Sequence, residues 1–397
     1  MFFYRLGHIP ELALAEFNSL KTASSAVDTT KSGLKFDSKY LLTNQAVQAS
    51  KMGSVVYSGK IYQKIESADD LAQVIADLYD QRPVKKLGIS INAAINSKKL
   101  IQLAHEVGFK KINILHDKEP NAGHFKDIAD WIVVFEFYGE IYAGVITDIA
   151  DQEIFARLDT SLPGGNMRRG KMNLKLALSI LNLASFGDTK YIWDPFCGQG
   201  GLIAVSLLFN QKPVICTDLS RAAIKDLRQN LDWIEKNAAE LGINPEKSAI
   251  LHIEKMEAQN LATASQESNM LGIIRKNFPK FDFKQTAIVT EGYLGPVFGQ
   301  NLPTQPELYK ILDEVEALWR QLLQQASILG IPEIIFCLPA YKAPNGEPYR
   351  IDLDQLFDGS QFELVELLPS KYFVDYSRPR SRVIHQIQKA VLKKNIE

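Results

Sequence analysis

A glycine-rich segment between a strand and a helix constrains this chain most strongly. Residues Asp194–Leu202 read DPFCGQGGL, directly after the apolar run YIWD and before a helical pattern. Glycines at such a junction let the backbone approach a ligand closely. The third glycine of a dinucleotide-binding loop is absent, because Ile203 stands there, and the Lys-Ser/Thr pair of a phosphate-binding loop is also absent. The segment therefore predicts a nucleoside-type ligand without a pyrophosphate.

Short strands and helices alternate around this segment. Five β-branched runs are typical of strands buried in a parallel sheet. They cover residues 191–196, 214–218, 248–253, 286–291 and 333–338. Helical patterns lie between them at residues 201–210, 221–242 and 307–330, and two more runs at 362–368 and 381–392 close the chain. This order predicts an α/β fold with an open, doubly wound sheet and a ligand crevice at its carboxyl edge.

The first 160 residues mix strands and helices and contain no internal repeat. Strand patterns occupy residues 2–6, 54–62, 85–92 and 112–116, a hairpin is expected over 131–147, and helical patterns begin at residues 10, 69 and 97. The Gly- and Pro-containing stretch 159–171 reads as a linker or a functional loop, and a helix is expected over 172–187. We therefore predict an α+β region (1–160), a linker with a connecting helix (161–187) and an α/β domain (188–397).

Composition excludes several classes of protein. With 45 Lys and Arg against 46 Asp and Glu, the net charge of -1 rules out binding to nucleic acid by bulk charge. Three cysteines without a CxxC pair argue against a zinc or disulfide framework and fit a reducing cytoplasm. The six histidines show no metal-ligand spacing, so no metal is expected. The longest uncharged run, 195–211, is too short and polar to span a membrane, and the charged N-terminal segment does not resemble a secretory signal.

Two acidic residues follow the strands next to the glycine segment. Asp218 ends the second strand of the α/β half, where a carboxylate can accept both ribose hydroxyls of a nucleoside; alternatively, it caps the next helix. Glu257 follows the third strand, where it could hold an adenine amino group or stand in a solvated loop. With the glycine segment upstream, Asp218 is the better supported ligand residue.

The glycine segment resembles the D-P-F-C-G-S-G-T motif of class I S-adenosylmethionine-dependent methyltransferases that act on exocyclic amines of nucleic-acid bases. Upstream, Arg157, Asp159, Pro163 and the run 170–177 look like the corresponding stretch of THUMP-containing tRNA guanosine 2-amino methyltransferases. The N-terminal LGHIPELALAEF is similar to the opening of the same family. The resemblance covers most of the chain and is most specific from 157 to 218.

The resemblance implies a Rossmann-like class I methyltransferase domain, with a seven-stranded and mostly parallel sheet, preceded by a THUMP-type RNA-binding half. It implies S-adenosylmethionine as the cofactor. The residues that it assigns to cofactor binding are Asp194, Phe196, Gly198, Gly200, Asp218 and Glu257, with Asp194 shaping the loop. Some relatives use a small activating subunit, so a partner of this kind stays open here.

The chain departs from the family after the fourth strand. There the family carries Asp/Asn-Pro-Pro-Tyr/Phe, whereas residues 290–296 read TEGYLGP. Glu291 could accept a hydrogen bond from the target amine and Tyr293 could stack on the base, but the register also allows Thr290 to stand for the family's acid. A structural turn with a buried tyrosine is the alternative. The departure leaves the target base and its target atom open.

Two basic stretches could contact RNA. Arg168, Arg169 and Lys171 stand together without an acidic neighbour, and residues 369–397 interleave Lys and Arg with aromatics. Each stretch alone could be a solvated edge. Together with the resemblance they predict a methyltransferase that acts on a guanosine amine in tRNA. The alternatives are a DNA adenine amino-methyltransferase, which would not need the N-terminal half, and a non-catalytic RNA-binding protein that retains the fold.

Overall fold

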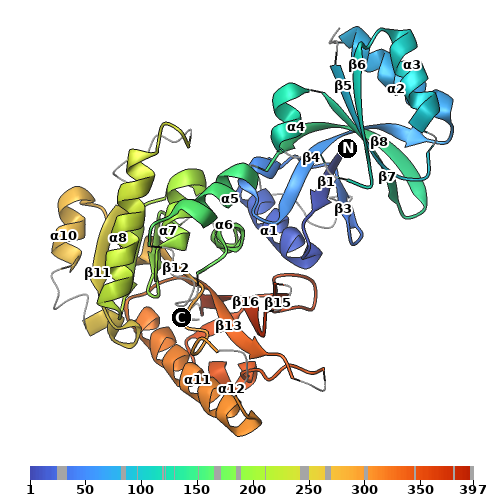
Figure 1. The fold of residues 1–397 in the computed structure, drawn as a ribbon. Helices are drawn as coiled ribbons and strands as arrows, with labels where there is room; N and C mark the ends of the chain where they lie inside the picture. Colours follow the sequence, from blue (N-terminus) through green and yellow to red (C-terminus); the bar gives the residue numbers. More distant parts are fainter. Residues whose placement is uncertain are drawn as a thin grey trace. The chain divides into compact units, whose positions relative to one another are not determined.

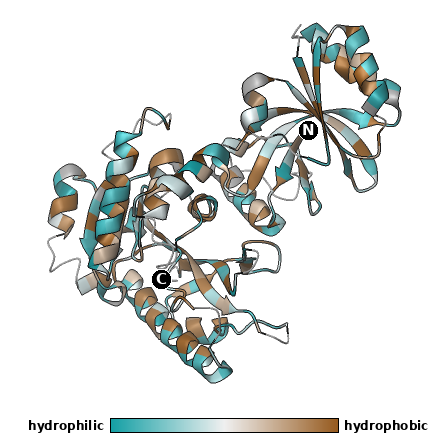
Figure 2. Ribbon diagram, in the orientation of Figure 1, coloured by the Kyte–Doolittle hydropathy of each residue, from teal (hydrophilic) through white to brown (hydrophobic). Residues whose placement is uncertain are grey.

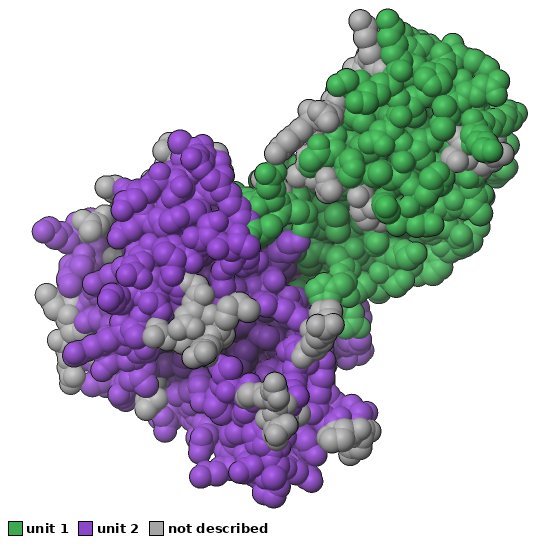
Figure 3. All heavy atoms as spheres, in the orientation of Figure 1, with its two compact units in different colours: residues 1–13, 25–156 green, residues 14–24, 157–397 purple. Residues whose placement is uncertain are grey.

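The computed structural model forms two compact units (Figure 3), and each is described by itself. Unit 1 contains residues 1–13 and 25–156, and unit 2 contains residues 14–24 and 157–397. The structure describes residues 1–24, 34–81, 86–95, 97–118, 120, 122–128, 130–150, 152–164, 171–184, 189–210, 212–241, 250–263, 270–298, 303–343, 346–378 and 381–393. No helix in these ranges has both the length and the apolar character needed to cross a membrane.

Unit 1 is built on an eight-stranded sheet with the order β2-β3-β1-β4-β8-β7-β5-β6 (Figure 1). Its strands are β1 (Phe2–Leu6), β2 (Lys35–Phe36), β3 (Tyr40–Thr43), β4 (Val55–Ile65), β5 (Lys86–Asn92), β6 (Lys111–His116), β7 (Trp131–Phe137) and β8 (Glu140–Ile149). Strand β5 is parallel to β6 and β7, and the other pairs are antiparallel. The predicted hairpin is confirmed as β7 and β8. The short strands β2 and β3 are absent from the sequence prediction.

Helices α2 (Ala68–Gln81) and α3 (Ser97–Val107) pack against one another and against this sheet. The predicted apolar face of α2 is confirmed, because Leu71, Val74, Ile75 and Leu78 are all buried in one core. Figure 2 shows hydrophobic and hydrophilic residues alternating around both helices, as expected for helices with one buried face. Unit 1 also contains α4 (Ala122–Asp127). Two helices, α1 (Pro10–Ser24) and α5 (Gln152–Ser161), cross the boundary between the units, which falls after Ala13 and after Ala156.

Unit 2 contains the predicted doubly wound sheet, with the order β11-β10-β9-β12-β13-β16-β14 and with β15 also paired to β16. Its strands are β9 (Tyr191–Asp194), β10 (Val214–Asp218), β11 (Ile250–Lys255), β12 (Thr286–Thr290), β13 (Glu333–Tyr341), β14 (Phe362–Leu364), β15 (Phe373–Tyr376) and β16 (Val383–Leu392). The five strands from β11 to β13 are parallel, and β16 is antiparallel to its three neighbours. The sheet is Rossmann-like, and it has one strand, β15, more than the seven predicted.

The helices of unit 2 follow the predicted pattern with shifted ends. They are α6 (Leu174–Asn182), α7 (Gly201–Val205), α8 (Arg221–Lys236), α10 (Met270–Asn277), α11 (Gln305–Ile328) and α12 (Leu353–Phe357). Helix α11 begins two residues before the predicted start because Thr304 and Glu307 form a capping box. Helix α7 is shorter than predicted because the chain continues from Ser206 to Asn210 as a π-helical turn.

The strand order of unit 2 reverses between β9 and β12, which are adjacent and parallel. The connections from these two strands lead to opposite sides, so a crevice opens beyond their carboxyl ends. Asp194 ends β9, Asp218 ends β10 and Thr290 ends β12, so all three stand at this edge. The fold therefore brings the glycine segment and the TEGYLGP segment together.

A buried ion pair stabilises the sheet of unit 2 at the amino end of β13, at the edge opposite the crevice. Glu333 is 4% exposed, and its carboxylate accepts a hydrogen bond from Thr189 Oγ1 (2.7 Å) and pairs with Lys389 Nζ (3.0 Å). Lys389 Nζ also donates to the carbonyl of Leu183 at 3.0 Å. Lys389 belongs to the basic C-terminal stretch that the sequence suggested as an RNA contact. Its amino group is instead engaged inside the fold.

We expect Lys389→Met to lower the free energy of unfolding by about 3–5 kcal/mol, because it removes the ammonium group that pairs with the buried Glu333 carboxylate. Lys393→Met removes the same charge from an exposed lysine whose amino group bonds only the Ser360 carbonyl, at 2.7 Å, among the described residues, and it should change stability by less than about 0.5 kcal/mol. Chemical denaturation of both variants measures the difference. Equal losses would contradict the structural role of Lys389.

Candidate active site

The glycine segment forms a tight loop between β9 and α7. Cys197 N–H donates to the Thr217 carbonyl (3.0 Å), which ties the loop to β10, and Gly200 N–H donates to the Cys197 carbonyl (2.8 Å). Gly200 is the N-cap residue of α7. Gly198 has φ 51°, and a Cβ at this position would lie 3.9 Å from the Phe196 carbonyl oxygen, its nearest neighbour beyond the adjacent residues in the described part of the chain. Glycine at this position thus permits the left-handed backbone and leaves open space beside the loop.

Asp218 joins the loop to the second strand. Its Oδ2 accepts a hydrogen bond from Gly198 N–H at 2.9 Å, and its Oδ1 accepts one from Ser220 N–H at 2.8 Å. Ser220, not Asp218, caps helix α8, because its hydroxyl accepts from Ala223 N–H at 3.2 Å. The alternative of a simple capping aspartate therefore does not describe Asp218.

A cavity of about 550 Å³ opens at this edge of the sheet. This volume lies in the range of small-molecule sites, about 300–1,000 Å³. The predicted residues that line it are Asp194, Phe196, Gly198, Asp218, Glu257, Glu291, Tyr293 and Lys171. Glu257 is exposed, and its carboxylate accepts from Asn260 Nδ2 at 2.9 Å. One cavity therefore brings together residues from the glycine loop, the ends of β10 and β11, and the segment after β12.

The structure separates the roles of Thr290 and Glu291. Thr290 is fully buried, its hydroxyl donates to the Asp194 carboxyl group, and its Oγ1 accepts from Gly292 N–H at 3.0 Å. Thr290 is not among the residues that line the cavity, whereas Glu291 and Tyr293 are. Of the two candidate acceptors, Glu291 is therefore the one that faces the cavity. Tyr293 is 41% exposed, so the alternative of a buried tyrosine in a structural turn is wrong.

Glycine replaces proline in shaping the segment after β12. Gly292 has φ 73°, and a Cβ there would lie 2.5 Å from the indole ring of Trp319 on α11. The Tyr341 hydroxyl donates to the Leu294 carbonyl at 2.8 Å, which fixes the following residues against β13. The segment is therefore held in a defined turn although it lacks both prolines of the family motif.

Burial raises the pKa of Asp194 to about 7. The side chain is 4% exposed, and the hydrogen bonds from Thr290 and from Phe196 N–H (3.1 Å) only partly offset the loss of water, while the nearby carboxylates of Asp218 and Glu291 raise the pKa further. Burial also raises the pKa of Tyr293, so its hydroxyl stays protonated at neutral pH.

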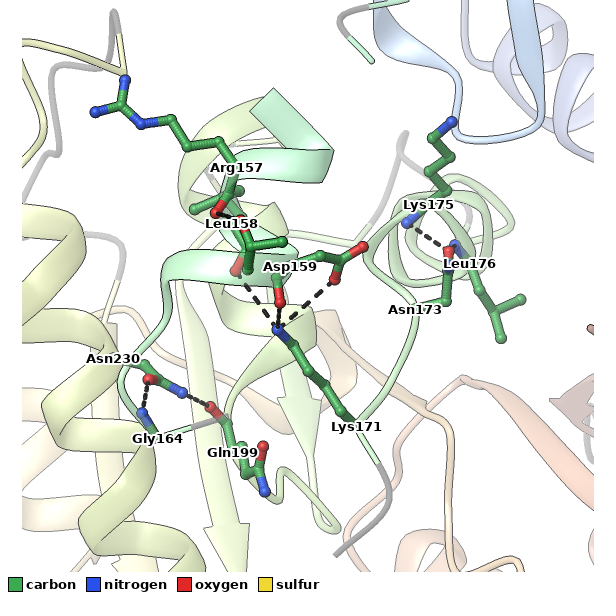
Figure 4. Close-up of polar contacts among 11 residues, drawn as sticks. Arg157, Leu158, Asp159, Gly164, Lys171, Asn173, Lys175, Leu176, Gln199 and Asn230 are labelled. Carbon is green, nitrogen blue, oxygen red and sulfur yellow. Dashed lines mark hydrogen bonds and ion pairs between the residues drawn. The ribbon is translucent and has the colours of Figure 1, made fainter. Parts of the chain in front are cut away.

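Lys171 lies at the cavity with its amino group engaged (Figure 4). Its Nζ donates to the carbonyls of Leu158 and Asp159 and lies 3.8 Å from the Asp159 carboxylate. Burial lowers the pKa of Lys171, and the Asp159 charge opposes this effect. Arg168 and Arg169, the other two predicted RNA contacts, lie outside the described residues. The role of all three in RNA binding stays a prediction.

Asn230 is a site residue that the sequence reasoning missed. It lines the cavity and is 3% exposed; its Oδ1 accepts from Gly164 N–H (2.7 Å) and its Nδ2 donates to the Gln199 carbonyl (2.8 Å), as Figure 4 shows. The side chain thus joins the start of the linker to the glycine loop. A polar residue on the apolar face of the predicted helix 221–242 was the available signal.

The basic C-terminal stretch divides into exposed and structural parts. Tyr372 is 46% exposed, whereas Tyr376 is 5% exposed. Phe373 lies under the guanidinium of Arg350, 5.1 Å from ring centroid to Cζ. The stretch therefore does not form one continuous RNA-binding surface.

In the described ranges, no three His, Cys, Asp or Glu side chains are grouped to hold a metal ion.

Comparisons with known proteins find distant likeness in structure alone. No protein-family model matches the sequence, and no curated protein matches it. TrmN from Thermus thermophilus is 14% identical with a TM-score of 0.47, and the alignment covers 99% of each chain. A possible methylase from Clostridium difficile 630 is 12% identical with a TM-score of 0.48, over 100% of this chain and 99% of that one. A predicted N6-adenine-specific DNA methylase from Listeria monocytogenes is 11% identical with a TM-score of 0.44, over 98% and 95%.

We expect Asp194→Asn to stabilise unit 2 at alkaline pH relative to the wild type. The folded pKa of about 7 exceeds the ordinary value of 3.8, so folding takes up a proton and stability falls as pH rises from about 4 to about 7. Asparagine removes this loss. The difference in melting temperature between variant and wild type should therefore increase from pH 5 to pH 8; a constant difference would contradict the raised pKa.

Proposed function

We propose that this chain is an S-adenosylmethionine-dependent RNA methyltransferase that methylates the exocyclic amine of a guanosine in tRNA. One observation carries the proposal. A single cavity at the switch point of a Rossmann-like sheet is lined by the glycine loop and Asp218, and also by Glu291 and Tyr293. The glycine loop and Asp218 can bind a nucleoside, and Glu291 and Tyr293 can bind a base that carries an amine.

The lining residues fit the cofactor. The open space beside Gly198 admits a ligand close to the backbone, and the Asp218 carboxylate can accept hydrogen bonds from ribose hydroxyls. Asp194 holds the loop, Phe196 supplies an apolar wall, Gly200 starts α7, and Glu257 is available for an adenine amino group. S-adenosylmethionine, when bound, supplies an electrophilic methyl group. The chain supplies no metal-ligand cluster in its described ranges, and this transfer needs none.

The remaining residues suit the acceptor amine. A Glu291 carboxylate can accept a hydrogen bond from one amine N–H, which directs the nitrogen lone pair away from the base plane and toward the reacting carbon. Tyr293, being 41% exposed, has ring surface on which a base can stack. These two side chains act by orientation and electrostatics, so strong acid–base chemistry is not required.

Several finer features belong to the same proposal. Residues 1–160 would act as a THUMP-type RNA-binding region, residues 161–187 as the linker and connecting helix, and residues 188–397 as the methyltransferase domain. Arg168, Arg169 and Lys171 would contact RNA phosphates. A cytoplasmic location follows from the substrate, and a small activating subunit would be an additional partner.

A glycine pair tests the cofactor site. Gly198→Ala and Gly359→Ala both place alanine at positive φ, 51° and 67°, without a close clash, so each should cost about 1–2 kcal/mol of stability. Only Gly198 lines the cavity. A ligand whose free concentration is 100 times its Kd stabilises the folded protein by about 2.7 kcal/mol. We expect S-adenosylmethionine to raise the melting temperature of the wild type and of Gly359→Ala, but not of Gly198→Ala.

Transfer of a labelled methyl group from S-adenosylmethionine to bulk tRNA tests the activity, with single-stranded and duplex DNA as parallel acceptors. We expect label in tRNA and, after nucleoside analysis, in N2-methylguanosine. Glu291→Ala should lower the rate about a hundredfold, whereas Glu363→Ala, at an exposed residue of β14, should not. Label only in DNA would support the DNA adenine methyltransferase instead. Cofactor binding without label in any acceptor would support the non-catalytic RNA-binding protein.

A further inference from the structure

A histidine from the edge of the sheet contacts the proposed amine acceptor. His385 on β16 lies opposite Pro339 of β13, and its Nε2 is 2.8 Å from Glu291 Oε1. Both side chains are largely buried, 16% and 20% exposed. The sequence does not indicate this contact, because ninety-four positions separate His385 from Glu291 and no local pattern links them.

The second ring nitrogen of His385 determines how this contact works. Nδ1 is buried, and it has no hydrogen-bond partner in the described part of the chain. A buried N–H without an acceptor is destabilising, because it has lost its hydrogen bond to water and gained none in the fold. A neutral ring therefore carries its proton on Nε2 and donates it to Glu291. The opposite arrangement, a protonated Glu291 that donates to Nε2, would place a proton on the unpartnered Nδ1.

We propose that His385 is a positioning residue that holds the Glu291 carboxylate, by an Nε2–H···Oε1 hydrogen bond, as an anionic acceptor for the target amine. This inference rests on the proposed function for the identity of the acceptor. The described residues contribute no other hydrogen bond to the Glu291 carboxylate, so Oε2 keeps its accepting capacity. With Oε1 fixed, the side chain of Glu291 loses rotational freedom before substrate arrives.

Several titratable groups of the described residues surround the pair. The Tyr376 ring on β15 meets the His385 ring edge to face, with centroids 5.8 Å apart. Arg378 bonds Tyr376 and lowers its pKa, although burial raises it more. On the other side, Cys337 and Asp194 both lie within electrostatic range of Glu291, and burial raises the pKa of each. His385 is therefore the nitrogen donor that faces Glu291 among these groups.

The chain offers a matched control. His252 on β11 pairs with Glu254 through Nε2···Oε2 at 2.9 Å, and its side chain is 12% exposed. The two pairs have nearly the same chemistry, distance and burial. Neither His252 nor Glu254 lines the cavity. Substitutions at His252 thus report the general cost of losing a half-buried His–Glu pair.

Steady-state methyl transfer from S-adenosylmethionine to bulk tRNA tests the functional part. We expect His385→Phe to lower kcat about tenfold to a hundredfold while KM for tRNA and Kd for S-adenosylmethionine change less than about twofold. His385→Gln, whose amide nitrogen can replace Nε2–H, should recover most of kcat, and His252→Phe should leave kcat unchanged. Equal losses in His385→Phe and His252→Phe, or no rescue by glutamine, would overturn the proposal.

The hydrogen bond itself can be tested without any activity. Long-range ¹H–¹⁵N correlation spectra of the full-length protein at pH 8.5, assigned with His385→Gln, report which ring nitrogen carries the proton. We expect the Nε2–H tautomer at His385. The Nδ1–H tautomer would overturn the proposal, even in an active enzyme. Conversely, the Nε2–H tautomer in a protein that methylates neither tRNA nor DNA would leave the His385–Glu291 bond standing and would refute the proposed function.

Discussion

The buried carboxyl group of Asp194 joins the parts of the site. It accepts hydrogen bonds from Phe196 N–H, inside the glycine loop, and from the Thr290 hydroxyl at the end of the neighbouring strand. Through Thr290 it also reaches Gly292 N–H. These bonds connect the two strands between which the sheet order reverses, and the crevice opens there. The high desolvation cost of this group indicates that its geometry is maintained at the expense of stability.

The segment after β12 holds a defined geometry through a glycine turn and two hydroxyl groups. Gly292 reaches a backbone conformation that side chains disfavour, and it packs directly against the Trp319 ring. Tyr341 and Thr290 hold the residues on either side. As a result, Thr290 points into the protein and Glu291 faces the cavity. His385 then adds a polar contact to Glu291 from a strand that follows much later in the chain.

Features set by local sequence could be predicted, and features set by distant contacts could not. The alternation of buried strands and amphipathic helices predicted the doubly wound sheet, and the glycine spacing located the loop beside Asp218. The roles of Thr290 and Glu291 depend on which side chain faces inward at the end of β12, and the sequence allowed both registers. Asn230 and His385 contact segments far from them in sequence, so no local pattern identifies their partners. Lys389 carries the positive charge expected of an RNA contact, but its amino group pairs with Glu333 inside the fold.

The central claim is that one cavity holds a nucleoside against Asp218 with its reactive end toward Glu291. A crystal structure of the protein with S-adenosylhomocysteine tests this most directly. We expect the ligand in the cavity, with its ribose hydroxyls within hydrogen-bond distance of the Asp218 carboxylate and its sulfur on the side of Glu291 and Tyr293. Ligand bound elsewhere, or an unchanged cavity in crystals grown with saturating ligand, would contradict the account.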